Sequence, residues 1–170
     1  MQAEQRRHTI LAALKEAQRP ISATVLANRF SVSRQVIVGD IALLRAAGEE
    51  ISATPRGYVI QHSPVGFVRQ VVCCHDAAGM EAELNIMVDH GCTVQDVTVE
   101  HPIYGQLTGA LQLSNRYDVQ QFIQRNQESD ARPLSDLTEG IHLHTLVCPN
   151  EAAFDRVCAA LRELKILLED

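Results

Sequence analysis

The first 60 residues are divided by helix-ending residues into a fixed order of short segments. Apolar residues recur at helical spacing over residues 4–17, and Pro20 ends that segment. Ser22 is suited to cap a second, short helix, because its hydroxyl can accept from the free N–H groups of a first turn. After a tight turn, Ser33 begins a third amphipathic helix that Gly48 ends.

A β-hairpin is expected next, over residues 51–60, where two β-prone runs flank a Pro/Gly turn. Three helices followed by a hairpin is the order of a winged helix-turn-helix, whose third helix enters the DNA major groove. The residues expected to contact DNA are Ser33, Arg34 and Gln35 on that helix and Arg56 at the wing tip. The alternative is an ordinary three-helix unit on which both arginines are solvated charges.

The charge distribution also separates the chain into two parts. Residues 1–63 hold eight basic and five acidic side chains, a balance of +3, whereas the remainder holds seven and sixteen, a balance of −9. A basic head on an acidic body favours binding of a polyanion. A chain of 170 residues has room for two small domains, which we place at residues 1–62 and 63–170.

The compartment follows from what the sequence lacks. No run approaches the roughly 18 to 20 apolar residues of a membrane span, and residues 1–8 lack the apolar run of a signal peptide. We therefore expect a cytoplasmic protein with no membrane partner. The cysteine number is odd, no CxxC pair occurs and all lie in apolar surroundings, which favours buried reduced thiols over disulfides. They are Cys73, Cys74, Cys92, Cys148 and Cys158.

The acidic part predicts an α+β domain with the element order β-α-β-β-α-β-α. The expected strands are residues 64–73, 92–100, 104–114 and 140–148, and the expected helices are 77–89, 116–128 and 152–168. Two βαβ-like halves of this kind build a two-layer α/β sandwich, a mainly antiparallel sheet with helices on one face. HPr-like and ferredoxin-like strand orders both fit.

Two histidines in the last expected strand indicate a metal site. Alternate side chains of a strand share one face, so His142 and His144 can point at one centre. His75 ends the first strand of this domain, and Glu83 lies about two turns into the following helix. Three imidazoles and one carboxylate suit Zn, Ni, Co or Fe(II) rather than Mg or Ca, and we expect a divalent transition metal, Ni or Zn. The alternative is a solvent-facing histidine pair.

The third helix of the head resembles a known family. Residues 32–38 with Asp40 and Ile41 are similar to the recognition helix of biotin-repressor-type winged helix domains, and most of all to the niacin-responsive transcriptional repressors of Gram-positive bacteria. Gly39 stands where that family usually has glutamine. Glycine within a helix costs about 1 kcal/mol relative to alanine and removes a polar contact, so an operator sequence is not carried over.

The resemblance continues through the acidic part. Three parts of this segment are similar to the domain named 3H for its three histidines, which follows the winged helix in those repressors. They are the pair His75 and Glu83, the stretch 99–105 and the stretch 137–145. The resemblance implies that His75, Glu83, His142 and His144 ligate a divalent transition metal. It further implies a homodimer formed by the C-terminal domains and nicotinic acid as co-repressor.

Three further residues are candidates for binding that ligand. Tyr104 can stack on a pyridine and His101 can donate to a carboxylate, although both also fit an ordinary turn between strands. Arg116 can bond both carboxylate oxygens at once, although it also fits an ordinary helix start.

The function expected from these features is a non-enzymatic, DNA-binding repressor that responds to nicotinic acid and controls genes of NAD biosynthesis or niacin uptake. A two-fold dimer would recognise an inverted repeat in double-stranded operator DNA. One rival is a regulator for which the metal itself is the signal. The other is a metal-dependent hydrolase, for which the chain shows no additional base or nucleophile motif.

Overall fold

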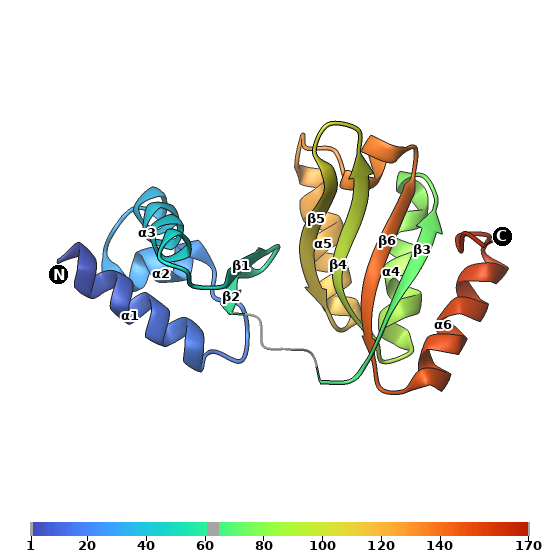
Figure 1. Ribbon diagram of the computed structural model, residues 1–170, viewed down its shortest axis with the longest axis horizontal. Helices are drawn as coiled ribbons and strands as arrows, with labels where there is room; N and C mark the ends of the chain where they lie inside the picture. The colour runs from blue at the N-terminus through green and yellow to red at the C-terminus, as the bar shows by residue number, and fades with distance from the viewer. Residues whose placement is uncertain (1, 61–64, 170) are drawn as a thin grey trace. The chain divides into compact units, whose positions relative to one another are not determined.

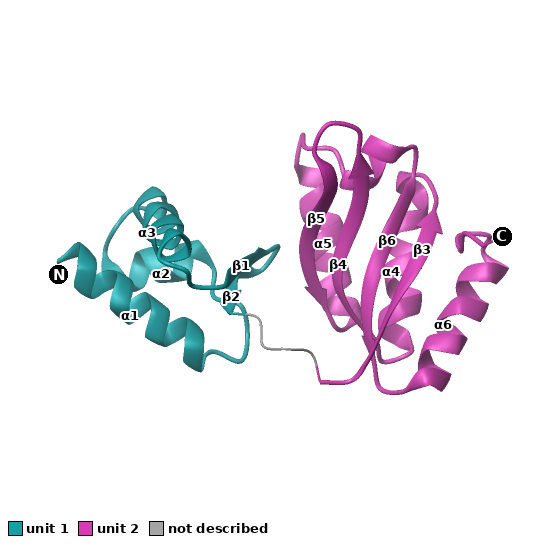
Figure 2. Cartoon of the chain, viewed as in Figure 1, with its two compact units in different colours: residues 1–63 teal, residues 64–170 magenta. Residues whose placement is uncertain are grey.

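Two separate hydrophobic cores organise the chain, one in each of two compact units, Met1–Ser63 and Pro64–Asp170 (Figure 2). The computed structural model describes residues 2–60 and 65–169. The expected boundary after residue 62 falls in the segment 61–64, outside the described residues. Within the described ranges, no helix combines the length and the apolar character needed to cross a bilayer.

The N-terminal unit has the expected winged helix-turn-helix order. Its elements are α1 (Ala3–Glu16), α2 (Ala23–Phe30), α3 (Arg34–Ala46), β1 (Ile51–Thr54) and β2 (Gly57–Ile60) (Figure 1). Ser22 and Ser33 cap α2 and α3 as predicted, since their hydroxyls accept from the backbone N–H groups of Val25 and Val36 at 3.2 and 3.3 Å. β1 and β2 pair antiparallel as the hairpin.

A buried ion pair holds α3 against α1. Asp40 lies in the middle of α3 with 3 % of its surface exposed, and Arg6 of α1 donates to it through two nitrogens at 2.6 and 3.2 Å. Arg7 places a third nitrogen 3.7 Å from the same carboxylate. A buried carboxylate needs such partners because desolvation penalises its charge. The pair therefore fixes the orientation of α3, the helix expected to enter DNA.

The C-terminal unit is a two-layer α+β sandwich. Its elements in chain order are β3 (Phe67–Cys74), the 3₁₀ turn η1 (Ala77–Gly79), α4 (Met80–Asp89), β4 (Thr93–His101), β5 (Gly105–Leu113), α5 (Arg116–Glu128), the 3₁₀ segment η2 (Leu134–Thr138), β6 (Ile141–Cys148) and α6 (Glu151–Glu163). Side chains of α4, α5 and α6 share one core with the sheet, and Figure 1 shows α4 and α5 behind it.

The strand order is β3-β6-β4-β5, and all three pairings are antiparallel. The first and fourth strands of the domain are thus neighbours, and the fourth also pairs with the second. This is the HPr-like order, which resolves the choice that hydrophobic periodicity left open. It places β6 in the interior of the sheet, flanked on both sides, so that side chains of β6 on the helix face are buried.

The last helix is shorter than predicted. It was expected to reach residue 168, but α6 ends at Glu163 and Lys165 adopts a left-handed backbone with φ of 57°. The following residues run beside β3, where Leu167 bridges to Cys73 and the Leu168 N–H donates to the Val72 carbonyl at 2.9 Å. Pairing with an exposed strand edge satisfies backbone groups that a longer helix would leave open to solvent.

The expectation of reduced thiols is wrong for one pair of cysteines. Cys92 and Cys148 form a disulfide, whereas Cys73, Cys74 and Cys158 are free. The cause is strand register: Thr93 lies opposite Val147, so Cys92 and Cys148 extend that ladder by one step, with their Cα atoms 4.2 Å apart. Because the two cysteines are 56 positions apart in the sequence, their proximity depends on the pairing of β4 with β6.

Because each unit has its own core, damage to one should leave the other folded. Ile37 of α3 is fully buried in the N-terminal core, and replacing it with alanine should cost that unit about 2–5 kcal/mol. Leu161→Ala, in the C-terminal core, is the matched control and should destabilise only the other unit. Differential scanning calorimetry should resolve two transitions that shift separately; a single transition lowered by either variant would contradict this expectation.

Candidate metal centre and nucleic-acid interface

The four predicted metal ligands converge around one carboxylate. Glu83 is 1 % exposed. Its Oε2 lies 2.7 Å from His75 Nε2 and 3.4 Å from His144 Nε2, and its Oε1 lies 3.0 Å from His142 Nε2. Neighbouring imidazole rings meet edge to face, with centroids 4.8 and 4.9 Å apart. The solvent-facing histidine pair weighed above is not what the structure shows, since His142 and His144 are 2 % and 3 % exposed.

The surrounding elements explain this convergence. His142 and His144 alternate along β6 and face the helix layer, where Glu83 projects from the first turn of α4. Glu83 lies earlier in its helix than the predicted two turns, because η1 precedes α4 as a separate turn capped by Asp76. Gly140 has φ of +92°, and a Cβ there would overlap the backbone of His75, so glycine lets the two segments meet.

Backbone carbonyls determine which nitrogen of each histidine carries a proton. The Nδ1 atoms of His75, His142 and His144 lie 2.6, 2.8 and 2.7 Å from the carbonyl oxygens of Asp76, Gly140 and Asp96. A carbonyl only accepts, so each Nδ1–H donates. In the neutral ring the Nε2 lone pair then faces Glu83, and three lone pairs beside a carboxylate require a cation, either protons or a metal.

The pKa shifts in the metal-free protein agree with this account. Burial alone would raise the pKa of Glu83, but the charge of His144 and the hydrogen bonds from the three imidazoles hold it well below its usual value. Burial alone would lower the pKa of His75 and of His144, but Glu83 outweighs it and raises both. The raised pKa values of His75 and His144 therefore widen the pH range over which protons supply positive charge to the cluster.

The donor set fits a transition metal. Three imidazole nitrogens and one carboxylate oxygen suit Zn, Ni, Co or Fe(II), and backbone acceptors orient each ring as in metal sites generally. A bound divalent cation would satisfy the three Nε2 lone pairs and the Glu83 charge together.

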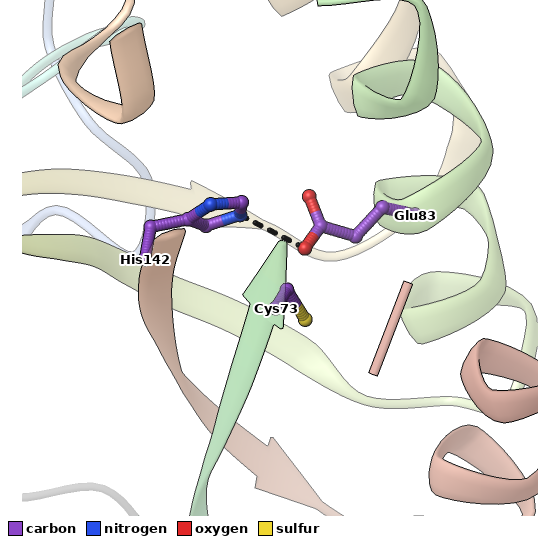
Figure 3. Close-up of side chains that lie close together, drawn as sticks. All are labelled: Cys73, Glu83 and His142. Carbon is purple, nitrogen blue, oxygen red and sulfur yellow. Dashed lines mark hydrogen bonds and ion pairs between the residues drawn. The ribbon is translucent and has the colours of Figure 1, made fainter. Parts of the chain in front are cut away.

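Sequence reasoning missed one residue beside this cluster. Cys73 of β3 is fully buried, and its sulfur, a Glu83 oxygen and a His142 nitrogen all lie within 4.8 Å of one another (Figure 3). Burial, together with the charge of Glu83 and a hydrogen bond to it, raises the pKa of the Cys73 thiol. Its spacing of two residues before His75 was the available signal, since i and i+2 share a strand face.

The three residues expected to bind nicotinic acid do not form one pocket within a single chain. His101 and Tyr104 lie at the β4–β5 turn, with ring centroids 5.0 Å apart, at the end of the sheet where β6 begins. Arg116 begins α5 at the opposite end of the sheet, where its Nε donates to Asp89 at 2.7 Å. The assignment of Arg116 to a shared pocket with His101 and Tyr104 is therefore not supported within one subunit, because β5 separates them along its length.

The residues expected to contact DNA lie on α3 and the wing. Arg34 and Gln35 are exposed in the first turn of α3, and Ser33 is its N-cap. Arg56 is half-buried in the turn between β1 and β2. The exposed face of α3 continues through Val38, Gly39 and Ala42, which sequence reasoning did not place there. A Cβ at Gly39 would meet nothing within 4 Å, so packing does not require the glycine.

Comparison with known proteins identifies the family. A model described as an HTH domain matches residues 6–59, and one described as a 3H domain matches residues 68–170. The transcription repressor NadR of Bacillus subtilis is 44 % identical over 97 % of this chain and 94 % of its own length. The probable transcription repressor NiaR of Thermotoga maritima is 38 % identical over 98 % and 95 %.

The chain belongs to the 3H-domain repressor family. The resemblance found in the sequence is thereby confirmed. In this chain the 3H domain carries the convergent cluster and the HTH domain carries the exposed helix α3.

The stability of this 3H domain should depend on pH in opposite directions with and without metal. The raised pKa values of His75 and His144 stabilise the metal-free fold below about pH 6.5, and this contribution is lost as pH rises. The lowered pKa of Glu83 stabilises it above about pH 4.5, and this contribution is lost as pH falls. With Zn present, stabilisation should instead grow toward higher pH, because protons compete for the nitrogens.

Thermal unfolding from about pH 5 to 9, with chelator or with Zn, measures both trends. Glu83→Gln, which removes the central charge, should flatten the metal-free trend and abolish the Zn effect. Parallel curves with and without Zn would contradict the assignment of these residues as ligands.

Proposed function

We propose that this protein is a cytoplasmic transcription repressor that binds operator DNA through its HTH domain and responds to nicotinic acid through a metal-holding 3H domain. The observation that carries the proposal is the near full-length match to two proteins named as transcription repressors. The genes it controls would serve NAD biosynthesis or niacin uptake, and the protein would act as a regulator rather than an enzyme.

The exposed face of α3 would supply DNA recognition. Arg34 can bond two acceptors of guanine and Gln35 two groups of adenine, while Ser33 can donate its hydroxyl proton to a phosphate. Arg56 in the wing would approach the sugar–phosphate backbone or the minor groove. The charge balance of +3 in residues 1–63, against −9 in the remainder, favours DNA contact by this unit.

The metal would be held by His75, Glu83, His142 and His144. A divalent Zn or Ni ion would supply a fixed positive charge that replaces protons among the three imidazoles. Because these residues come from the end of β3, from α4 and from β6, the ion would tie the first turn of α4 to the sheet. We assign it this supporting part in the response to the effector.

The turn between β4 and β5 would contact nicotinic acid. His101 Nδ1 accepts from the backbone N–H groups of Ile103 and Tyr104 at 3.2 and 3.3 Å, so in the neutral ring Nε2 carries the proton. That N–H can donate to a carboxylate, and the Tyr104 ring, which is 72 % exposed, can stack on a pyridine. Arg116 forms an ion pair with Asp89 instead, so we do not include it in the nicotinic acid site of the same subunit.

A homodimer would couple operator binding to the binding of nicotinic acid. Two α3 helices related by a two-fold axis recognise an inverted repeat with half-sites about one DNA turn apart, or a multiple of it. Co-repression requires nicotinic acid to bind the DNA-competent arrangement more tightly than the other, and DNA then tightens nicotinic acid binding by the same factor.

The helix assignment can be tested by substitution. Arg34→Ala should weaken operator binding by roughly 5- to 150-fold, the range for losing a bidentate base contact, without changing metal content. Arg125→Ala is the matched control, because Arg125 is an exposed arginine on α5 of the C-terminal unit and should not affect DNA binding. Fluorescence anisotropy at fixed salt measures both, and equal affinities for the two variants would show that α3 does not read the DNA.

The effector can be tested by titration. The affinity of metal-loaded protein for its own upstream DNA should rise with nicotinic acid and not with nicotinamide, and His144→Ala should lose both metal and this response. If neither compound changes affinity while a chelator abolishes DNA binding, the metal itself is the signal. Steady DNA affinity under all these conditions would remove both regulatory schemes.

A further inference from the structure

The interior of the 3H domain contains a thiol that is not among the four proposed metal ligands, three imidazoles and one carboxylate. Cys73 lies on β3 directly opposite His142 of β6, so both side chains project from the same face of the sheet toward α4. Cys73 is fully buried, and Figure 3 shows it with Glu83 and His142, each contributed by a different element. Its neighbour Cys74 points to the opposite face because successive strand residues alternate.

The distances allow one ion to reach this thiol. The sulfur of Cys73, one Glu83 oxygen and one His142 nitrogen all lie within 4.8 Å of one another. In a four- or five-coordinate zinc site with bonds of about 2.0–2.3 Å, neighbouring ligand atoms lie roughly 3–3.5 Å apart, so the required closure is on the order of 1–2 Å. Rotation of these side chains can supply that movement without rebuilding the strands.

We propose that Cys73 is a thiolate ligand of the metal in this 3H domain, binding it together with Glu83 and His142. The inference rests on the proposed metal centre and extends it by one donor. On binding, the divalent ion forms a bond to sulfur, the S–H bond breaks, and the proton leaves to solvent. A thiolate is a soft donor, so the site selects zinc over the harder divalent ions.

A structural interpretation of Cys73 makes a different prediction. Small buried thiols often act only as packing residues, and the hydrogen bond from this thiol to Glu83 would suit that role. A packing residue gives no spectroscopic signal from a bound metal, whereas a ligand does. The two interpretations are therefore separable in the intact protein.

Cobalt(II) is the probe, because it substitutes for zinc and gives a near-ultraviolet charge-transfer band only when a thiolate binds it. Full-length protein stripped of metal and titrated with Co(II) should show this band at one equivalent. Cys73→Ser should retain stoichiometric cobalt but lose the band, and its zinc affinity should fall at least about tenfold. Cys74→Ser is the matched control and should leave band and affinity unchanged, as should Cys158→Ser.

Each result has one meaning. Stoichiometric cobalt without the band in the wild-type protein overturns the inference while leaving the histidine–glutamate centre intact, and this result does not depend on any variant folding. A band that survives in Cys73→Ser, or disappears in Cys158→Ser, likewise overturns the assignment. No cobalt binding by the wild-type protein would overturn the metal centre itself. Glu83→Gln, which should not bind the metal, shows what the absorption spectrum looks like in that case.

Discussion

A buried carboxylate facing three imidazole nitrogens is the constraint on which the C-terminal domain depends. Glu83 is almost fully enclosed, and an isolated charge there would be costly. Three backbone carbonyls accept from the Nδ1–H groups of His75, His142 and His144, so the opposite nitrogens face Glu83. The cluster is therefore stable only with added positive charge, and this requirement links its protonation, its fold and its capacity for metal.

The sheet order makes this cluster possible. Because β6 lies between β3 and β4, its helix-facing side chains are covered by α4, and the start of β6 meets the end of β3. The same order brings Cys73 opposite His142 and Cys92 beside Cys148. In a ferredoxin-like order the fourth strand would lie at the sheet edge, and the two histidines would lose one of their flanking strands.

The exposed helix α3 and the charged cluster are supported by different hydrophobic cores. The N-terminal core and the Arg6–Asp40 ion pair hold α3 with its polar first turn exposed. The C-terminal core holds the charged cluster. In the proposed repressor, communication between effector and DNA would therefore pass through the arrangement of whole domains rather than through a shared core.

Much of the architecture could be predicted from the sequence because it depends on local physics. Pro20, the capping hydroxyls of Ser22 and Ser33, and hydrophobic periodicity determine where helices begin and end. The alternation of His142 and His144 and their resemblance to the 3H motif were enough to select all four residues that converge.

Strand register, by contrast, was decided only by the tertiary structure. The disulfide, the position of Cys73 and the separation of Arg116 from His101 depend on which strands pair and on which end of the sheet a residue lies. Local patterns carry no information about pairing across tens of residues. The sequence alone therefore determined the elements and the four residues of the converging cluster, while long-range packing decided their neighbours, because those contacts exist only once the sheet has formed.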